Sequence, residues 1–382
     1  MSTARRSLIA IAAVGLVACQ DAPRLAGPSA DPVATPAPAA AKAATATRSV
    51  FYAGLDNPRG LAFGPDGYLY VAEGGTGGTA EATTEEQCEQ VIPPVGPYTG
   101  DFTARISRIS PAGERETVID GLPSSQTSEA SGSLVSGIAD VEFVGHTLYA
   151  LTAGAGCSHG FPDDPNGLYR VNSDGTWTLV ADLGAFLMAN PVVNAEEDDF
   201  EPDGTWYDMV AVRGDLYAVE PNHGELDRIT TSGGVSRIVD ISASQGHVVP
   251  TAIAYHGNFY VGNLSTFPSV DGDATIYHIT PSGRIPETIG SLTTVLGVAF
   301  DQQGRMYALE SFVCSSPCFP TPEAGRLVRV HRDGTVETVV DGLNFPTGMT
   351  FGPDGALYVS VNGFGGPTNS GAGAIERIVL SG

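Results

Sequence analysis

The stretch Leu61-Ala62-Phe63-Gly64-Pro65-Asp66-Gly67-Tyr68-Leu69-Tyr70-Val71-Ala72-Glu73 decides the fold. Apolar residues lead up to Pro-Asp-Gly and resume directly after it. Proline presets the first angle of a turn, and glycine tolerates the positive φ that follows, so these three residues predict a tight turn. We therefore expect a strand, a turn and a second strand here.

The same phrase recurs along the chain. Residues 351–360 repeat it almost unchanged, and four looser copies lie between. All six copies place a tyrosine at the same point of the second strand. These tyrosines are Tyr70, Tyr149, Tyr217, Tyr260, Tyr307 and Tyr358. A unit that repeats at this period indicates a repeat architecture.

Each repeat continues with two further alternating segments joined by a glycine-containing turn, which is typical of a hairpin. In the first repeat these segments are residues 104–109 and 116–122. The sixth repeat stops before its fourth strand, and residues 49–55 at the opposite end of the domain resemble residues 337–343. The first strand can therefore complete the last repeat and remove the open edges of the sheet.

These features predict an all-β protein, a six-bladed β-propeller with four antiparallel strands per blade, closed by an N-terminal strand. A seven-bladed WD-type propeller and a β-solenoid are the alternatives. No Trp-Asp signature and no seventh copy occur in the sequence, and solenoid turns are shorter. The expected blades span residues 56–122, 136–183, 206–242, 247–290, 293–343, and 344–380 with 49–55.

The first 48 residues are expected to lie outside the fold. Residues 1–18 combine two arginines with a short apolar run, which fits a secretory signal and is too short to span a membrane. The run ends at Cys19 in a pattern that resembles the bacterial lipoprotein box, which implies lipid attachment to Cys19 and outer-membrane or periplasmic localisation. An ordinary signal peptide with an incidental cysteine, and a secreted protein, is the alternative. Residues 19–48 are rich in alanine and proline and predict a flexible tether.

Residues 56–67, followed by 69–73, resemble the opening of ScyD/ScyE family proteins, which belong to the NHL-like six-bladed propellers. Residues 139–143 resemble the second blade of that family, with Ala139 in place of an expected histidine. The resemblance covers residues 49–382. It implies a propeller fold and, for members that accompany scytonemin biosynthesis, an accessory role in secondary-metabolite assembly.

Charge limits the partners of the domain. Of the 43 acidic and 19 basic residues in the chain, two acidic and five basic residues precede residue 49, so the domain carries 41 acidic and 14 basic residues. Such a surface repels nucleic acid and anionic membrane, and any membrane contact would use the lipid anchor alone. The domain has no lysine, which excludes Schiff-base and P-loop chemistry. Simple solubility of an exported protein also accounts for the acidity.

The four cysteines after Cys19 suggest disulfides, because their number is even and the chain is expected to be exported. Cys314 and Cys318 would close a small loop. Cys88 and Cys157 lie in corresponding loops of adjacent blades and would form the second bond. A zinc site built from all four is the alternative, and it would require distant blades to converge.

The long, variable loops predict the functional face. They follow the second strand or precede the first strand of each blade, so they share one face, whereas the opposite face has only short turns. The residues that begin the first strands on this face include Arg59, Thr251 and Thr347, which we expect to bind a ligand. The acidic run of residues 196–204 is interpreted as a solvent-exposed loop.

Second-strand ends place oxygen-bearing residues at four equivalent positions, namely Glu73, Glu220, Asn263 and Glu310. Oxygen ligands that converge at a channel mouth suit calcium, and they resemble the metal site of gluconolactonase-type propellers. Pairing of these residues with Arg59 and with backbone amides is the alternative. In an enzyme of this type the ion would polarise a carbonyl and Asp140 or Asp208 would act as the base.

The sequence therefore predicts a monomeric binding or interaction module. Its ligand would be a small molecule, a glycan or a protein at the long-loop face, with no cofactor required and calcium as the metal to test. A divalent-metal-dependent, lactonase-like hydrolase and an accessory protein of scytonemin-type biosynthesis are the alternative functions.

Overall fold

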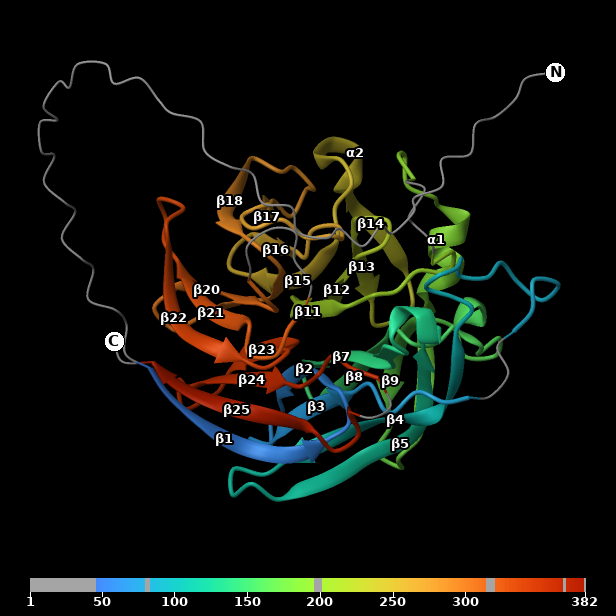
Figure 1. Ribbon diagram of the computed structural model, residues 1–382, viewed down its shortest axis with the longest axis horizontal. Helices are drawn as coiled ribbons and strands as arrows, with labels where there is room; N and C mark the ends of the chain where they lie inside the picture. The colour runs from blue at the N-terminus through green and yellow to red at the C-terminus, as the bar shows by residue number, and fades with distance from the viewer. Residues whose placement is uncertain (1–45, 80–82, 196–200, 314–319, 367–368, 381–382) are drawn as a thin grey trace, which may run out of the picture. The chain divides into compact units, whose positions relative to one another are not determined.

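The computed structural model describes residues 46–79, 83–195, 201–313, 320–366 and 369–380. Its strands form six sheets arranged as the blades of a propeller (Figure 1). The first strands of successive blades contact each other in the order of the chain, and the sixth contacts the first, so the ring is closed. The prediction of a six-bladed β-propeller is confirmed.

The strands within each blade follow one another from the centre outward. Blade 1 consists of β2 (Pro58–Phe63), β3 (Leu69–Glu73), β4 (Thr99–Ile109), β5 (Arg115–Gln126) and the short β6 (Val135–Ser136). Blade 2 consists of β7 (Ile138–Val144), β8 (Thr147–Thr152), β9 (Gly167–Val171) and β10 (Trp177–Asp182). Blade 3 consists of β11 (Asp208–Val212), β12 (Asp215–Glu220), β13 (Glu225–Thr230) and β14 (Val235–Asp240).

The remaining blades repeat this order. Blade 4 consists of β15 (Pro250–Tyr255), β16 (Phe259–Asn263), β17 (Ala274–Ile279) and β18 (Glu287–Leu292). Blade 5 consists of β19 (Val295–Phe300), β20 (Met306–Glu310), β21 (Gly325–Val330) and β22 (Val336–Leu343). Blade 6 consists of β23 (Gly348–Phe351), β24 (Leu357–Val361), β25 (Gly373–Leu380) and β1 (Ala46–Leu55).

Ring closure joins the two ends of the domain. The strand β1 pairs antiparallel with β25 and forms the outer edge of blade 6. It begins at Ala46, ahead of the expected start at residue 49, and Arg48 forms an ion pair with Glu376 of β25. The expected swap of the first strand into the last blade is therefore present.

The tyrosine of the repeated phrase has two roles. The hydroxyl of Tyr70 donates to Asp66 in the preceding turn at 3.0 Å, and its ring packs edge-on against Phe143 of blade 2 at 4.9 Å. A Cβ at Gly64 would lie 2.6 Å from this ring, so glycine gives the tyrosine its space. The last copy is equivalent, because Tyr358 bonds Asp354 and packs against Phe63 of blade 1. The repeated tyrosine thus stabilises its own turn by a hydrogen bond and packs against the neighbouring blade.

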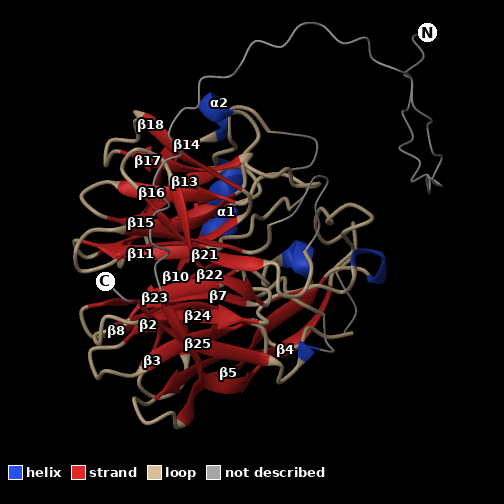
Figure 2. Ribbon diagram, turned by 60° about the vertical axis from the view of Figure 1, so that its left-hand side comes forward, coloured by secondary structure: helices blue, strands red, loops and turns tan. Residues whose placement is uncertain are grey.

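Short turns and long loops lie at opposite ends of the blades (Figure 2). The described parts of the long loops include the helices α1 (Leu183–Ala189) and α2 (Ser242–Gln245) and the 3₁₀ turns Glu129–Ser131 and Cys157–His159. A disulfide joins Cys88 to Cys157 and so connects the loops of blades 1 and 2 as predicted. The predicted Cys314–Cys318 bond and Cys19 lie outside the described residues. No helix in the described ranges is long and apolar enough to cross a membrane.

Candidate functional site

Two separate cavities define the candidate site. The first is the central channel, a cavity of about 330 Å³ lined by the first strands of the blades. The second, which we call the long-loop cavity, is about 1050 Å³ and is lined by the loops of the long-loop face. None of the residues that the structure describes lines both cavities.

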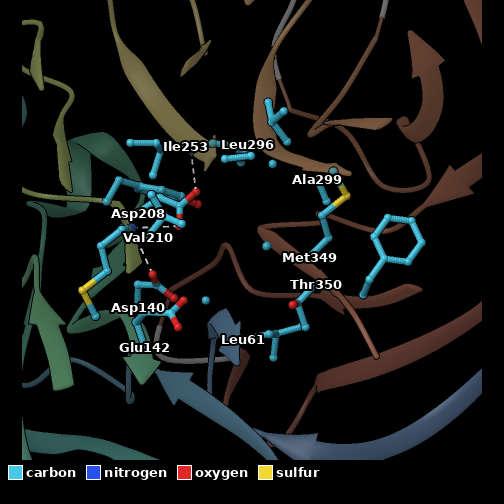
Figure 3. Close-up of a pocket in the computed structure, with 18 of the residues that line it drawn as sticks. Leu61, Asp140, Glu142, Asp208, Val210, Ile253, Leu296, Ala299, Met349 and Thr350 are labelled. Atoms are coloured by element: carbon cyan, nitrogen blue, oxygen red, sulfur yellow. Dashed lines mark hydrogen bonds between the residues drawn. The ribbon is translucent and has the colours of Figure 1, made fainter. Parts of the chain in front are cut away.

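One wall of the channel is acidic and the facing wall is apolar (Figure 3). The side chains of Asp140, Glu142 and Asp208 gather on one side, and those of Met349 and Ala299 lie opposite. All five come from first strands, where alternation turns every second side chain toward the axis. The predicted catalytic candidates Asp140 and Asp208 are thus brought together, and Glu142 was not anticipated.

The two aspartates also connect blades. Asp140 accepts from the amide of Met209 at 3.0 Å, and Asp208 accepts from the amide of Ile253 at 2.8 Å, each on the next blade. A Cβ at Gly60 of blade 1 would lie 1.8 Å from the Asp140 carboxyl and would clash with it. Glycine at this position therefore makes room for the carboxyl. These contacts give both residues a structural role independent of chemistry.

Burial raises the pKa of the three carboxyl groups on this wall and so favours their protonated forms. It raises the pKa of Asp208 to about 6 and that of Glu142 to about 7. Burial, and then the charge of Asp208, raises the pKa of Asp140 well above its ordinary value. The wall can therefore exchange protons near neutral pH, which is the property that a general acid or base requires.

Tyr207 lines the channel and forms a hydrogen bond across the ring. It precedes β11 of blade 3, and its hydroxyl donates at 3.2 Å to the carbonyl oxygen of Thr347, which precedes β23 of blade 6. These blades are opposite each other in the ring. The guanidinium of Arg59 lies 5.8 Å from the centre of the Tyr207 ring and donates to the carbonyl oxygen of Val135 at 2.6 Å.

The residues predicted to bind ligand make contacts between blades. The hydroxyl of Thr251 donates at 2.6 Å to the carbonyl oxygen of Val295 in the next blade, and that of Thr347 donates at 2.7 Å to Pro58. Both hydroxyls are buried and bonded. Thr347 also lines the channel, and the hydroxyls of both residues have partners within the protein.

The four metal candidates share the backbone-amide pairing that the sequence left open as the alternative to a metal site. Each accepts a hydrogen bond from a backbone amide in the loop that leads into the first strand of its own blade. The pairs are Glu73 with Asp56 at 2.8 Å, Glu220 with Thr205 at 2.9 Å, Asn263 with Val249 at 2.8 Å and Glu310 with Thr293 at 2.7 Å. We call these four residues the loop latches.

Two latches also form ion pairs, Glu73 with Arg115 and Glu310 with Arg326, rather than with Arg59. Asn263 accepts a second amide, that of Ser265, and Glu220 accepts that of His223. In the described ranges, no group of three or more His, Cys, Asp or Glu side chains is placed to hold a metal ion. Within the described residues, the glutamate latches therefore do not converge as a calcium site like that of gluconolactonase-type propellers would require.

A buried polar cluster holds the long loops together. The hydroxyl of Tyr98 donates to Glu201 at 2.8 Å, and its ring lies 4.4 Å from that of His159. Ser158 bonds Asp203 and lies 3.2 Å from Nδ1 of His159. Burial alone would lower the pKa of His159, but Glu201 and Asp203 outweigh it and raise this pKa.

This cluster corrects the interpretation of the acidic run. Glu201 and Asp203 are buried, because Tyr98 and Ser158 reach them from loops of other blades. Residues 196–200 of the run lie outside the described part of the chain. No local sequence signal identifies the buried positions, because their partners are distant in the sequence.

The long-loop cavity is mostly apolar. Pro94, Pro221 and Pro320 line it, together with the larger apolar side chains Val95, Leu134, Val249, Phe267, Phe345 and Phe364. Its polar lining includes Glu201, Thr205, Asn222 and His247. Among the described residues, loops from every blade except blade 2 contribute, so this surface exists only in the assembled ring.

The comparisons with known proteins identify the class alone. No sequence family and no curated protein matches the chain. A putative oxidoreductase (glucose dehydrogenase) from Thermus thermophilus is 15% identical with a TM-score of 0.54, over 87% of this chain and 100% of the other. The calcium-binding protein regucalcin from Agrobacterium tumefaciens is 14% identical with a TM-score of 0.52, over 89% and 96%.

A putative gluconolactonase is 13% identical with a TM-score of 0.50, over 88% of this chain and 92% of the other. At these identities the similarity concerns the fold. The chain is a six-bladed β-propeller with the architecture of these proteins.

Proposed function

We propose that this propeller binds a small, largely apolar molecule in the long-loop cavity. The observation that carries the proposal is the cavity itself, about 1050 Å³ in volume and walled by proline, aliphatic and phenylalanine side chains. Small-molecule sites in proteins are concave, mostly apolar and of similar size, with a few polar groups. A glycan or a protein segment at the same face is the alternative ligand.

Apolar surface in this cavity favours occupancy. Phe267 is 52% exposed, so about half of its surface contacts water. Removing apolar surface from water contributes about 25 cal/mol per Å², so a ligand that covers the phenylalanines gains free energy. Exposed apolar patches of this kind mark binding sites.

The walls are held in place before a ligand arrives. The Cys88–Cys157 disulfide joins the β3–β4 loop to the β8–β9 loop, and the Tyr98–Glu201 bond joins the same β3–β4 loop to the loop before β11. The latch Glu220 fixes Thr205 and Asn222 through their backbone amides. Preorganised loops lose less conformational entropy on binding, which increases affinity.

The test is binding of N-phenyl-1-naphthylamine, whose fluorescence rises in apolar surroundings. We expect saturable binding, weakened about tenfold in Phe364→Ala, which corresponds to about 1.4 kcal/mol. Leu179→Ala is the control, because Leu179 is 42% exposed on β10 and lies outside the cavity lining. Binding that is equal in wild type and Phe364→Ala would contradict the proposal.

Export and lipid anchoring are part of the proposal. The Cys88–Cys157 disulfide is consistent with an oxidising compartment, where such bonds persist. Replacement Cys19→Ser should release the protein from the membrane fraction of its bacterial host. Unchanged fractionation would contradict the lipid anchor but would not bear on export.

Similarity of residues 56–73 to ScyD/ScyE proteins supports an accessory role in secondary-metabolite assembly, in which the cavity would hold an intermediate.

A lactonase-like enzyme is the second candidate, favoured by the proton-holding wall of Asp140, Glu142 and Asp208 in the channel. Its test is lactone hydrolysis with and without added calcium. The enzyme proposal requires activity that Asp208→Asn reduces at least about 100-fold, as loss of a general base does. The binding proposal requires no lactone hydrolysis.

A further inference from the structure

Resting on the proposed function, we infer that the ligand of the long-loop cavity carries a hydroxyl or amino group that donates a hydrogen bond to Glu201. The ligand class is a ring-bearing apolar molecule, neutral or positively charged, with this donor at one end. The inference deepens the proposal from a cavity of suitable size to a chemical class, and it depends on contacts at the polar side of the cavity.

Glu201 presents an unused acceptor. The residue is 7% exposed and lines the cavity. Oε1 accepts the hydroxyl of Tyr98 at 2.8 Å, whereas Oε2 is buried and has no hydrogen-bond partner in the described part of the protein. A buried acceptor without a donor is unfavourable, so a donor from the ligand is stabilising there.

The described neighbours of Glu201 orient its carboxyl group but donate no hydrogen bond to Oε2. His159 approaches the same oxygen as Tyr98, with Nε2 at 3.8 Å from Oε1, which is too long for a hydrogen bond. The rings of Tyr98 and His159 pack together at 4.4 Å and are both buried. The carboxyl therefore has one oxygen bonded to Tyr98 and one that is buried without a hydrogen-bond partner among the described residues, on a residue that lines the cavity.

Asn222 adds a second polar point on the same side. Its Nδ2 is also buried without a partner among the described residues. Glu220 accepts the backbone amides of both Thr205 and Asn222 through Oε1, at 2.9 and 3.2 Å, so these two lining residues are held on one carboxyl group. A ligand with an acceptor atom next to its donor group would accept a hydrogen bond from Nδ2 of Asn222.

Aromatic side chains define the rest of the ligand. Phe345 and Phe364 belong to the loops of blade 6, which is opposite blade 3 in the ring. Rings contact flat aromatic surfaces with large area and little entropy loss. The excess of acidic residues in the domain opposes an anionic ligand, and Glu201 itself would repel one.

Three probes with one skeleton test the donor. N-phenyl-1-naphthylamine has an N–H and no charge, its N-methyl derivative lacks the N–H, and 1-anilinonaphthalene-8-sulfonate retains the N–H but is anionic. We expect the first to bind about tenfold more tightly than either of the others, a ratio that corresponds to one hydrogen bond to a charged group. Titrations by fluorescence on the folded full-length protein give the three dissociation constants.

Two variants separate this inference from the proposed function. Glu201→Gln keeps the shape and an oxygen for Tyr98 but replaces the unpaired acceptor Oε2 by an amide donor, so the preference for the N–H probe should fall to within about twofold. Phe364→Ala should weaken the two uncharged probes equally and keep their ratio. Circular dichroism and thermal midpoints confirm that both variants are folded.

The outcomes are distinct. Equal wild-type affinity for the N–H and N-methyl probes, with both weakened by Phe364→Ala, overturns the donor inference and leaves the cavity function. A wild-type preference that persists in Glu201→Gln also overturns it. Insensitivity of all probes to Phe364→Ala contradicts the proposed function itself.

Discussion

The hydroxyl of Tyr207 donates a hydrogen bond to the carbonyl oxygen of Thr347, 140 residues further along the chain and on the opposite side of the ring. One side chain thus joins blades 3 and 6 across the channel. Tyr207 lines the acidic channel, whereas Thr205, two residues earlier, lines the long-loop cavity.

Tyr207→Phe should lower the free energy of unfolding by about 1 kcal/mol, because the ring remains and only the cross-channel hydrogen bond is lost. Urea denaturation measures the change. Tyr68→Phe is the control, since the Tyr68 ring contacts Arg108 and its hydroxyl has no hydrogen bond among the described residues. It should change stability by less than about 0.5 kcal/mol. Equal effects in both variants would refute a bridging role for Tyr207.

The repeated tyrosine allows the turn bond and the blade contact to be measured separately. Tyr70→Phe removes the bond to Asp66 and should cost about 1 kcal/mol, whereas Tyr70→Ala also removes the contact with Phe143 and should cost about 3–5 kcal/mol. Thermal and urea unfolding give both values. If the alanine variant lost no more than the phenylalanine variant, interblade packing would not be the reason for the repeat.

Glu73→Gln should destabilise the protein by about 3 kcal/mol, because it leaves Arg115 partly buried without its carboxylate. Glu116→Gln, which disrupts an exposed pair with Arg108, should cost less than about 1 kcal/mol. A chelator should leave the thermal midpoint of the wild-type protein unchanged, since protein groups occupy the latch oxygens. A midpoint that falls with chelator in the wild type but not in Glu73→Gln would restore the metal-site hypothesis.

Stability should fall as pH rises through the channel carboxyls. The folded pKa of Glu142 is raised to about 7, so the folded state binds its proton more tightly than the unfolded state does. Its contribution is complete below the unfolded value near 4.5 and is lost as pH rises through about 7.

Glu142→Gln should therefore be more stable than wild type by about 1–2 kcal/mol at pH 8 and similar to it at pH 4. Denaturant titrations of both proteins across this range give the difference. A constant difference would show that Glu142 does not titrate on folding.

The blades could be predicted from sequence because the determinants are local. Alternation, the Pro-Asp-Gly turn and the tyrosine occur within about a dozen residues of each other, and they specify strands, turns and repeat number together. The prediction that β1 completes blade 6 follows from the same pattern.

The sites were less predictable because side-chain direction is not local. Register correctly placed Glu73 and Glu310 at equivalent strand ends, but the loop amides and arginines that hold them come from other segments. Tyr207 lies outside the repeated phrase, so no alignment of repeats reveals it. The composition around Glu201 predicted solvent exposure, and only the arrival of Tyr98 from a distant loop buries it.

The pairing of β1 with β25 has a consequence for biosynthesis. These strands are the first and last of the domain, and their residues pair across more than 300 positions, as Arg48 does with Ile378. Contacts of such long range form late, because the loop they close is long. The ring cannot close until β25 has been synthesised, because β25 is the partner of β1 and of β24. A truncation that removes β25 would leave unpaired edges on both of those strands, and such chains should aggregate.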